Sequence, residues 1–244
     1  MTKLFLIAAL AYALTLSQGV FSASSDPEVL LAPGWGKLSF EAPTAGTYEL
    51  PIIRPAAGGA ILNSDGKSLD LDDLLGEKIT ILSFIYRTCD DVNGCPLSTM
   101  VSHKLANKIS EQPKLADNLR LLTLSFDPQF DTPEAMKEFG EGIRGSSANE
   151  KGSADWQFLT SESDQAIQPI LDAYQQSVVP DASLKGGRKK FSHILRVYLI
   201  DREKQIRNIY NVSFLHPDIL INDVLTLIAE QQSTSDSNKK IANN

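Results

Sequence analysis

The chain's only two cysteines, Cys89 and Cys95, are separated by five residues in the segment ITILSFIYRTCDDVNGCP. A structural disulfide stabilises a fold more when it closes a longer loop, and this loop is short. Pro96 directly follows the second thiol, and proline is favoured in the first turn of a helix. The positive end of a helix stabilises a thiolate over a thiol. The placement therefore favours a reactive dithiol over a structural bridge.

Two predicted elements must position these thiols. Residues Ile79–Tyr86 are mostly apolar, β-branched or aromatic, which predicts a buried central strand that ends near Cys89. Apolar residues repeat with helical spacing after Pro96, which predicts a helix that starts next to Cys95. In open α/β sheets, sites form at the carboxyl ends of strands, and the two thiols fall at such an end.

A histidine is expected to complete this site. The chain has three histidines: His103, His193 and His216. We interpret His103 as a helix-flank residue and His216 as a helix-boundary residue. His193 directly precedes another predicted buried strand, from where it can reach the same sheet end. Two thiolates and an imidazole select copper, and zinc is the competing metal.

The order of the remaining elements predicts the fold class, an α/β thioredoxin-like three-layer fold. It has a mixed central sheet with helices on both faces and an N-terminal β-hairpin extension. The further strands are predicted at Thr47–Ile53, Ala60–Asn63, Leu119–Phe126, Trp156–Leu159, Ile194–Ile200 and Gln205–Tyr210. Further helices are predicted to start at Thr132, at Ser163 or Asp164, and at Pro217, with a short helical turn at Leu69–Leu75 and a polar, turn-rich segment at 177–192.

Composition sets the domain organisation and excludes one class of function. With 244 residues, of which 42% are hydrophobic, the chain fits one globular domain with tails. The net charge of −7 excludes a nucleic-acid binder, which needs a basic surface. We expect an irregular leader at residues 24–46, the thioredoxin-like domain at 47–232 and a disordered tail at 233–244.

The N-terminus has the pattern of an export signal. A short basic start, the apolar run LFLIAALAYALTL and a region of small residues predict a signal peptide over residues 1–23. The mature protein is then expected in the periplasm, with no membrane span. The alternative is an uncleaved segment that tethers the domain to the membrane, facing the periplasm.

Three segments together resemble a known family. SFIYRTCDDVNGCP, LSFDPQFDTPEAMKEF and FSHILRVYLID are similar to the three signature blocks of the Sco/SenC family, in the family's order, and the resemblance spans roughly Tyr48 to Gln231. Members of that family are thioredoxin-fold proteins that handle copper during assembly of cytochrome c oxidase and related copper enzymes. The resemblance implies that Cys89, Cys95 and His193 bind copper.

The sequence also departs from the family pattern. The family's C-x-x-x-C motif is a C-x5-C motif here, with Asn93-Gly94 inserted before Cys95. We expect this turn-prone pair to bulge outward and leave the sulfurs close together. Ser192 stands where the family more often has an acidic residue beside the histidine.

Three functions follow from these residues. The first is an exported copper-binding protein, a metal carrier rather than an enzyme, that delivers copper to a copper enzyme or its assembly factors. The second is a thiol–disulfide oxidoreductase in which Cys89 and Cys95 reduce the metal-ligand cysteines of a partner and are re-reduced by a periplasmic thiol reductant. The third is an interaction module in which the cysteine pair is only a structural disulfide.

Overall fold

The computed structural model describes residues 29–145, 153–181 and 190–242, and it describes side chains as far as Ser233. Residues from Leu31 onward form one compact unit. The predicted signal peptide, residues 1–23, lies outside the described residues, as does the start of the predicted leader.

The centre of this unit is an eight-stranded mixed sheet with the strand order β1-β10-β9-β4-β5-β6-β2-β3. Strands β4, β5 and β6 are parallel, whereas β9 and β2 run antiparallel to their neighbours β4 and β6. The strands are β1 (Arg54–Pro55), β2 (Ala60–Asn63), β3 (Ser68–Asp70), β4 (Ile79–Ile85), β5 (Leu119–Ser125), β6 (Asp155–Thr160), β9 (Val197–Ile200) and β10 (Gln205–Tyr210). Every residue of β4 and β5 is buried, as expected for strands that are covered on both faces.

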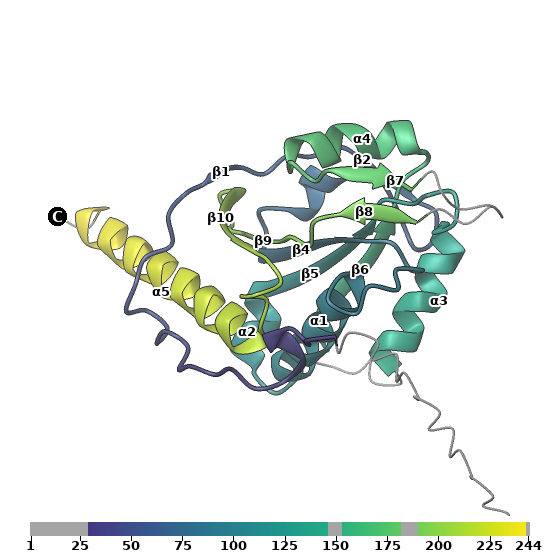
Figure 1. The fold of residues 1–244 in the computed structure, drawn as a ribbon. Helices are drawn as coiled ribbons and strands as arrows, with labels where there is room; N and C mark the ends of the chain where they lie inside the picture. Colours follow the sequence, from purple (N-terminus) through teal and green to yellow (C-terminus); the bar gives the residue numbers. More distant parts are fainter. Residues whose placement is uncertain (1–28, 146–152, 182–189, 243–244) are drawn as a thin grey trace, which may run out of the picture. The chain divides into compact units, whose positions relative to one another are not determined.

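Helices cover both faces of this sheet. Helices α1, α3 and α5 lie on one face and α4 lies on the other (Figure 1). The helices are α1 (Cys95–Ser110), α2 (Pro113–Asn118), α3 (Pro133–Arg144), α4 (Asp164–Ala173) and α5 (Pro217–Ala242), with 3-10 helices η1 (Pro33–Trp35) and η2 (Leu71–Leu74). This three-layer arrangement confirms the predicted thioredoxin-like α/β fold.

Local sequence signals explain where two of the helices begin. The hydroxyl of Thr132 accepts a hydrogen bond from Ala135 N at 3.3 Å, which caps α3. The hydroxyl of Ser163 accepts one from Ala166 N at 3.2 Å, which caps α4. A Cβ at Gly140 would lie 2.6 Å from the Phe158 ring, so this glycine lets α3 approach the sheet closely.

The N-terminal part of the sheet differs from the prediction. Thr47–Ile53 is not a strand, because Pro51 offers no N–H for a ladder, and pairing with β10 begins only near β1. The hairpin extension is present, but β2 pairs with β3 across the Asp65-Gly66 turn, and Thr47–Ile53 takes no part in it. Strand β3 overlaps the start of the predicted helical turn, of which only Leu71–Leu74 is helical.

The C-terminal helix is longer than predicted. Helix α5 continues to Ala242, whereas a disordered tail was predicted from residue 233. The polar composition of this stretch led to that prediction. Extending an existing helix adds a hydrogen bond per residue without a new nucleation cost, which favours continuation.

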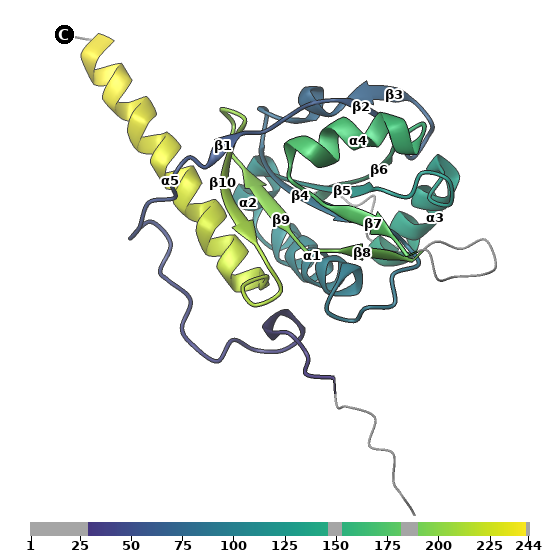
Figure 2. The ribbon, with the colours of Figure 1, turned by 45° about the horizontal axis from the view of Figure 1, so that its top comes forward.

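The segment predicted as polar and turn-rich also contains a small sheet. Strands β7 (Val178–Pro180) and β8 (Phe191–His193) form an antiparallel pair in which Val178 lies opposite His193. This hairpin lies between α4 and α1 in both views of the fold (Figures 1 and 2). Strand β9 starts only at Val197, so His193 belongs to its own short strand and does not lead directly into the central sheet.

Candidate metal centre

The first thiol of the candidate centre lies in the turn that follows β4. The N–H of Cys89 donates to the carbonyl of Tyr86 at 3.2 Å, so the chain turns sharply within four residues of the strand end. A buried carboxylate fixes this turn: Asp131 accepts hydrogen bonds from the Arg87 backbone N–H at 3.0 Å and from Arg87 Nε at 3.1 Å. The side chain of Cys89 is therefore half-buried at the carboxyl edge of the sheet.

The second thiol is the first residue of α1, which begins one residue before the predicted start at Pro96. Cys95 is 3% exposed, and the loop that precedes it is closed by two hydrogen bonds to Asp91. Gly94 N donates to the carbonyl of Asp91 at 2.8 Å, and Asn93 N donates to its carboxylate at 3.0 Å. These two hydrogen bonds close the loop, so the chain reaches the start of α1 despite the two additional residues.

The inserted pair Asn93-Gly94 does not bulge outward as expected. Gly94 is buried, and the side-chain oxygen of Asn93 accepts a hydrogen bond from Ala32 N at 2.9 Å. The physical reason is that the N-terminal segment supplies a donor that the expectation from local turn chemistry did not include. The expectation that the sulfurs stay close together agrees with the structure, because their atoms lie within 4.8 Å of each other.

Aromatic packing brings His193 to the thiols. Its ring lies 5.1 Å from the ring of Phe126 and 5.9 Å from that of Tyr86, centroid to centroid. Phe191, on the same short strand, packs against the same two rings at 5.4 and 5.1 Å. These contacts dock the β7–β8 hairpin on the carboxyl ends of β4 and β5.

Cys89, Cys95 and His193 form one group. One ligand atom from each lies within 4.8 Å of the others, and Cys95 Sγ is 3.5 Å from Nε2 of His193. Metal–ligand bonds of about 2.0–2.3 Å place two ligands of one ion at most about 4.6 Å apart, so a small movement suffices to enclose an ion. Nδ1 of His193 is buried and has no hydrogen-bond partner in the described part of the chain. The donor set fits a soft metal ion.

The two thiols differ electrostatically. A hydrogen bond from the Cys95 thiol lowers the pKa of Cys89, and this effect outweighs burial, which raises it; His193 and backbone N–H groups lower it further. The pKa of Cys95 is raised, because its proton is held in that hydrogen bond and because the side chain is buried. The pair therefore holds one thiolate and one thiol near neutral pH, with the thiolate on the more exposed residue.

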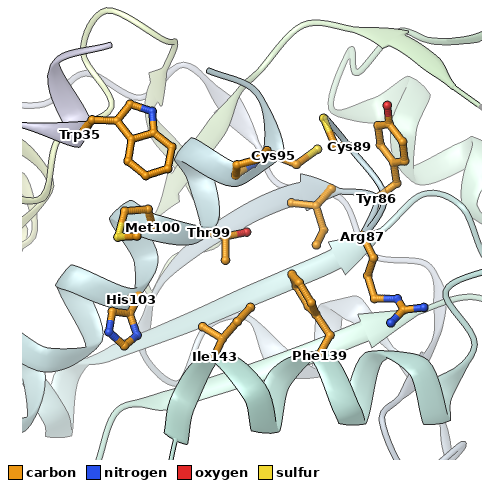
Figure 3. Close-up of a pocket in the computed structure, with 12 residues that line it drawn as sticks. Trp35, Tyr86, Arg87, Cys89, Cys95, Thr99, Met100, His103, Phe139 and Ile143 are labelled. Carbon is orange, nitrogen blue, oxygen red and sulfur yellow. The ribbon is translucent and has the colours of Figure 1, made fainter. Parts of the chain in front are cut away.

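Two cavities flank the thiols. One, of about 450 Å³, lies between α1 and α3 and has mainly apolar walls, with Trp35, Met100, Phe139 and Ile143 among them (Figure 3). The other, of about 500 Å³, lies along the β7–β8 hairpin and includes Asp90, Asp91 and Lys190. An ion pair between Lys190 and Asp90 joins the hairpin to the cysteine loop across this second cavity. Cys89 borders both cavities, so a ligand or a partner can reach it from either side.

The other two histidines are not in this group. His103 lines the apolar cavity from α1 and lies 3.3 Å from the side-chain amide of Asn107. His216 is 3% exposed, and its Nε2 lies 3.3 Å from the carbonyl of Gly36. In the described part of the chain, His193 is the histidine that lies with the thiols.

Sequence reasoning missed the residues that support the thiols from outside the motif. Asp131 is 1% exposed and, besides Arg87, accepts a hydrogen bond from the Ser125 hydroxyl at 2.6 Å. Its contacts with Arg87 join residues 44 positions apart, so no local pattern reveals them. The same holds for Trp35, whose indole N–H donates to the carbonyl of Val92 at 3.2 Å across 57 positions.

None of the helices in the described ranges is both long enough and apolar enough to span a bilayer.

Comparison with known proteins gives the family. The SCO1/SenC family model matches residues 60–229. The chain is 29% identical to the SCO1 protein homolog of Bacillus subtilis over 166 residues, which are 66% of this chain and 77% of that protein. The fold is similar to that of Arabidopsis thaliana ScoI with copper bound, with a TM-score of 0.57, 21% identity and coverage of 72% of this chain and 98% of that one.

It is also similar to BsSco, a protein with an identified disulfide switch in the Sco family of cytochrome c oxidase assembly proteins. That match has a TM-score of 0.55, 23% identity and coverage of 74% of this chain and 98% of BsSco. The family match includes the cysteine loop and His193, and its members share this fold. This chain, with a C-x5-C motif in place of C-x3-C, belongs to the SCO1/SenC family.

Proposed function

We propose that this chain is an exported copper-binding protein that delivers copper to a copper enzyme such as cytochrome c oxidase. The observation that carries the proposal is the group of Cys89, Cys95 and His193, whose ligand atoms lie within 4.8 Å of one another. Thiolates and imidazole are ligands that copper prefers, Cu(I) above all. The copper-bound Arabidopsis relative and the assembly role of BsSco support the same function.

The different exposure of the two thiols indicates how copper leaves the site. Both thiols must be reduced to bind the ion. Cys89 is half-buried and borders both cavities, whereas Cys95 is buried. An incoming ligand of the acceptor then meets copper on the side of Cys89. The ion passes through a state in which thiolates of both proteins share it.

Copper content after substitution tests this proposal. The reduced protein is expected to bind one copper ion per chain, and Cys89→Ser, Cys95→Ser and His193→Ala are each expected to abolish tight binding. His103→Ala is the matched control, because this histidine lies on α1 outside the group. Copper binding that survives all three substitutions would exclude this site. Zinc bound in preference to copper would reassign the metal.

Export is part of the proposal and rests on the N-terminal pattern of residues 1–23. The protein recovered from the periplasm is expected to start near residue 24. N-terminal sequencing of that protein tests this. A full-length protein in the membrane fraction would favour the tethered alternative.

A second candidate function, thiol–disulfide exchange, is favoured by the unequal thiols. The Cys89 thiolate would attack a partner's disulfide and form a mixed disulfide, and Cys95 would then attack Cys89 and release the partner as a dithiol. Two electrons and two protons pass to the partner, and the Cys89–Cys95 pair becomes a disulfide that a separate thiol reductant must reopen. Reduction of an oxidised copper-site peptide by the dithiol, without copper present, tests this activity.

A further inference from the structure

A short N-terminal segment contacts the cysteine loop directly. Residues Ala32–Trp35, which contain η1, form a segment that we call the strap. Its first residue, Ala32, donates its backbone N–H to the side-chain oxygen of Asn93 at 2.9 Å. Its last residue, Trp35, donates its indole N–H to the carbonyl of Val92 at 3.2 Å. The strap thus binds two consecutive residues of the loop between the thiols.

The strap is itself held firmly against the fold. Lys104 Nζ donates to the carbonyls of Gly34 and Trp35 at 2.8 and 3.0 Å. Gly34 is buried so closely that an added Cβ would lie 2.3 Å from the Leu215 carbonyl oxygen and 2.8 Å from Val101. The strap is therefore a fixed support for the loop.

The strap also borders the copper site. Trp35 lines the apolar cavity together with both cysteines, and Figure 3 shows its indole ring on the Cys95 side of that cavity. Through Ala32, the strap binds the side chain of Asn93, the first residue of the two-residue insertion. The insertion itself therefore provides one of the two groups by which the strap holds the loop.

We propose that the strap and the Asn93 side chain position the cysteine loop for metal binding and thereby compensate for its additional length. A loop with five residues between the thiols has more accessible conformations than one with three, so closing it around an ion has a larger entropic cost. Anchoring Val92 and Asn93 removes many of these conformations before the ion arrives. Asn93 and Trp35 are positioning residues, since neither belongs to the ligand group.

The anchors also affect the redox chemistry of the pair. Both cysteines are free in the structure, and a disulfide needs its sulfurs to approach to about 2.05 Å. We expect this closer approach to work against the two hydrogen bonds that anchor the loop to the strap. The anchored loop therefore favours the dithiol, and loss of an anchor shifts the pair toward the disulfide.

The test replaces Asn93 in the full chain. Asn93→Ala removes the acceptor for Ala32 N, and Asn93→Asp keeps an acceptor oxygen at the same place. The matched control is Asn222→Ala, because Asn222 holds another part of the N-terminal leader, with its side-chain amide donating to the Pro43 carbonyl at 2.8 Å. Trp35→Phe is a second variant, which keeps an aromatic ring in the cavity wall but removes the donor to Val92.

Two measurements are made on each variant. One is the affinity of the reduced protein for copper. The other is the equilibrium with glutathione, in which each pair that closes converts one oxidised glutathione into two reduced molecules. Asn93→Ala and Trp35→Phe are each expected to weaken copper binding and to shift the glutathione equilibrium toward the disulfide by about threefold to tenfold, the range of one neutral hydrogen bond. Asn93→Asp is expected to recover most of the loss.

The copper measurement rests on the proposed function, whereas the glutathione measurement does not, so failure of the strap and failure of the proposed function can be told apart. Values for Asn93→Ala and Trp35→Phe that match those of wild type and Asn222→Ala would overturn the positioning role. A melting temperature that falls equally for Asn93→Ala and Asn222→Ala, with neither measurement changed, would overturn it too. If the wild-type chain binds no copper, the proposed function fails, whereas the glutathione equilibrium still tests the strap.

Discussion

Cys89 and Cys95 have opposite electrostatic surroundings although both lie at the same sheet edge. The pKa of Cys89 is lowered, chiefly because the Cys95 thiol donates a hydrogen bond to it, and that of Cys95 is raised. Only the thiolate is nucleophilic, so Cys89 is expected to react with iodoacetamide at pH values well below the ordinary cysteine pKa of about 8.5. Cys95 is expected to react slowly throughout this range. Mass spectrometry of partly alkylated protein tests this, and equal rates with one shared pH profile would contradict it.

Asp131 is a single residue on which the position of Cys89 depends. Its buried carboxylate accepts from the backbone and the side chain of Arg87, two residues before the thiol. Asp131→Asn is expected to destabilise the fold by about 1–3 kcal/mol. A neutral amide then replaces the carboxylate in its charge-assisted hydrogen bonds, and the amide NH2, itself a donor, faces an N–H donor of Arg87. The substitution is also expected to weaken copper binding. Denaturant unfolding and copper titration measure the two effects, and unchanged values in both would show that the turn holds without this carboxylate.

At the residue scale, the sequence predicted that Cys89, Cys95 and His193 lie together, but it did not predict the residues that support them. The chemistry of Cys89, Cys95 and His193 follows from residue type and from position relative to predicted strands and helices. Asn93 and Asp131 act through contacts with residues 61 and 44 positions away. Only the tertiary fold determines those contacts. The turn-forming pair Asn93-Gly94, considered without them, predicted an outward bulge.

The β7–β8 hairpin is the element that carries His193, the proposed third ligand. Phe191 anchors it with ring contacts to Tyr86 at 5.1 Å and to Phe126 at 5.4 Å. Phe191→Ala is expected to weaken copper binding roughly tenfold, because two aromatic contacts of about 0.5–1.5 kcal/mol each no longer hold His193 at the thiols. The stoichiometry of one ion is expected to remain. Isothermal titration with Cu(I) measures both quantities.

Phe139→Ala is the matched control for the hairpin. Phe139 also makes a ring contact, at 5.9 Å with Phe158, but it lies on α3 across the apolar cavity. An equal loss of affinity in both variants would mean that general stability, and not the docking of the hairpin, controls binding.

Element length decided which parts of the fold were predictable. Strands β4 and β5 and helix α1 have long apolar or periodic patterns, and each was predicted close to its observed bounds. Strands β3, β7 and β8 have three residues each, too few for alternation to be distinguished from a polar loop. Their pairing depends on tertiary partners, and for β8 on the rings of Tyr86 and Phe126, which directly follow β4 and β5. The element that carries His193 was therefore missed although the residue was identified.

At the scale of the whole molecule, an ionic cluster joins the amino ends of the parallel strands, whereas Cys89, Cys95 and His193 lie at their carboxyl ends. Arg120 near the start of β5 donates to Asp155 at 2.9 Å and to Glu77 at 2.9 Å, and Lys78 lies 3.5 Å from Asp155. Arg120 is 8% exposed, so these partners offset the loss of hydration of its buried guanidinium. The cluster ties the amino ends of the strands together, at the opposite end of the sheet from Cys89 and Cys95.

This separation predicts how acid affects the protein. Burial alone would raise the pKa of Asp155, but hydrogen bonds from Gln157 and Arg120 and the charges of Arg120 and Lys78 outweigh it and lower that pKa. A carboxyl with a lowered folded-state pKa contributes its full stability above its unfolded pKa of about 3.9. That contribution is lost as the pH falls through the folded value. Asp155→Asn is therefore expected to cost about 1–3 kcal/mol at neutral pH, with the difference from wild type shrinking below about pH 4.

The same variant distinguishes the stability of the fold from the geometry of the site. Asp155 and the thiols lie at opposite ends of the parallel strands, and distant independent sites contribute additively. Asp155→Asn is expected to lower the free energy of unfolding while copper affinity at neutral pH and the reactivity of Cys89 stay at wild-type values. Urea unfolding between about pH 3 and pH 7, with copper titration at neutral pH, measures both. A loss of copper affinity that parallels the loss of stability would mean that the two ends of the sheet are coupled, and that the site's geometry depends on the whole sheet rather than on the turn, the strap and the hairpin around it.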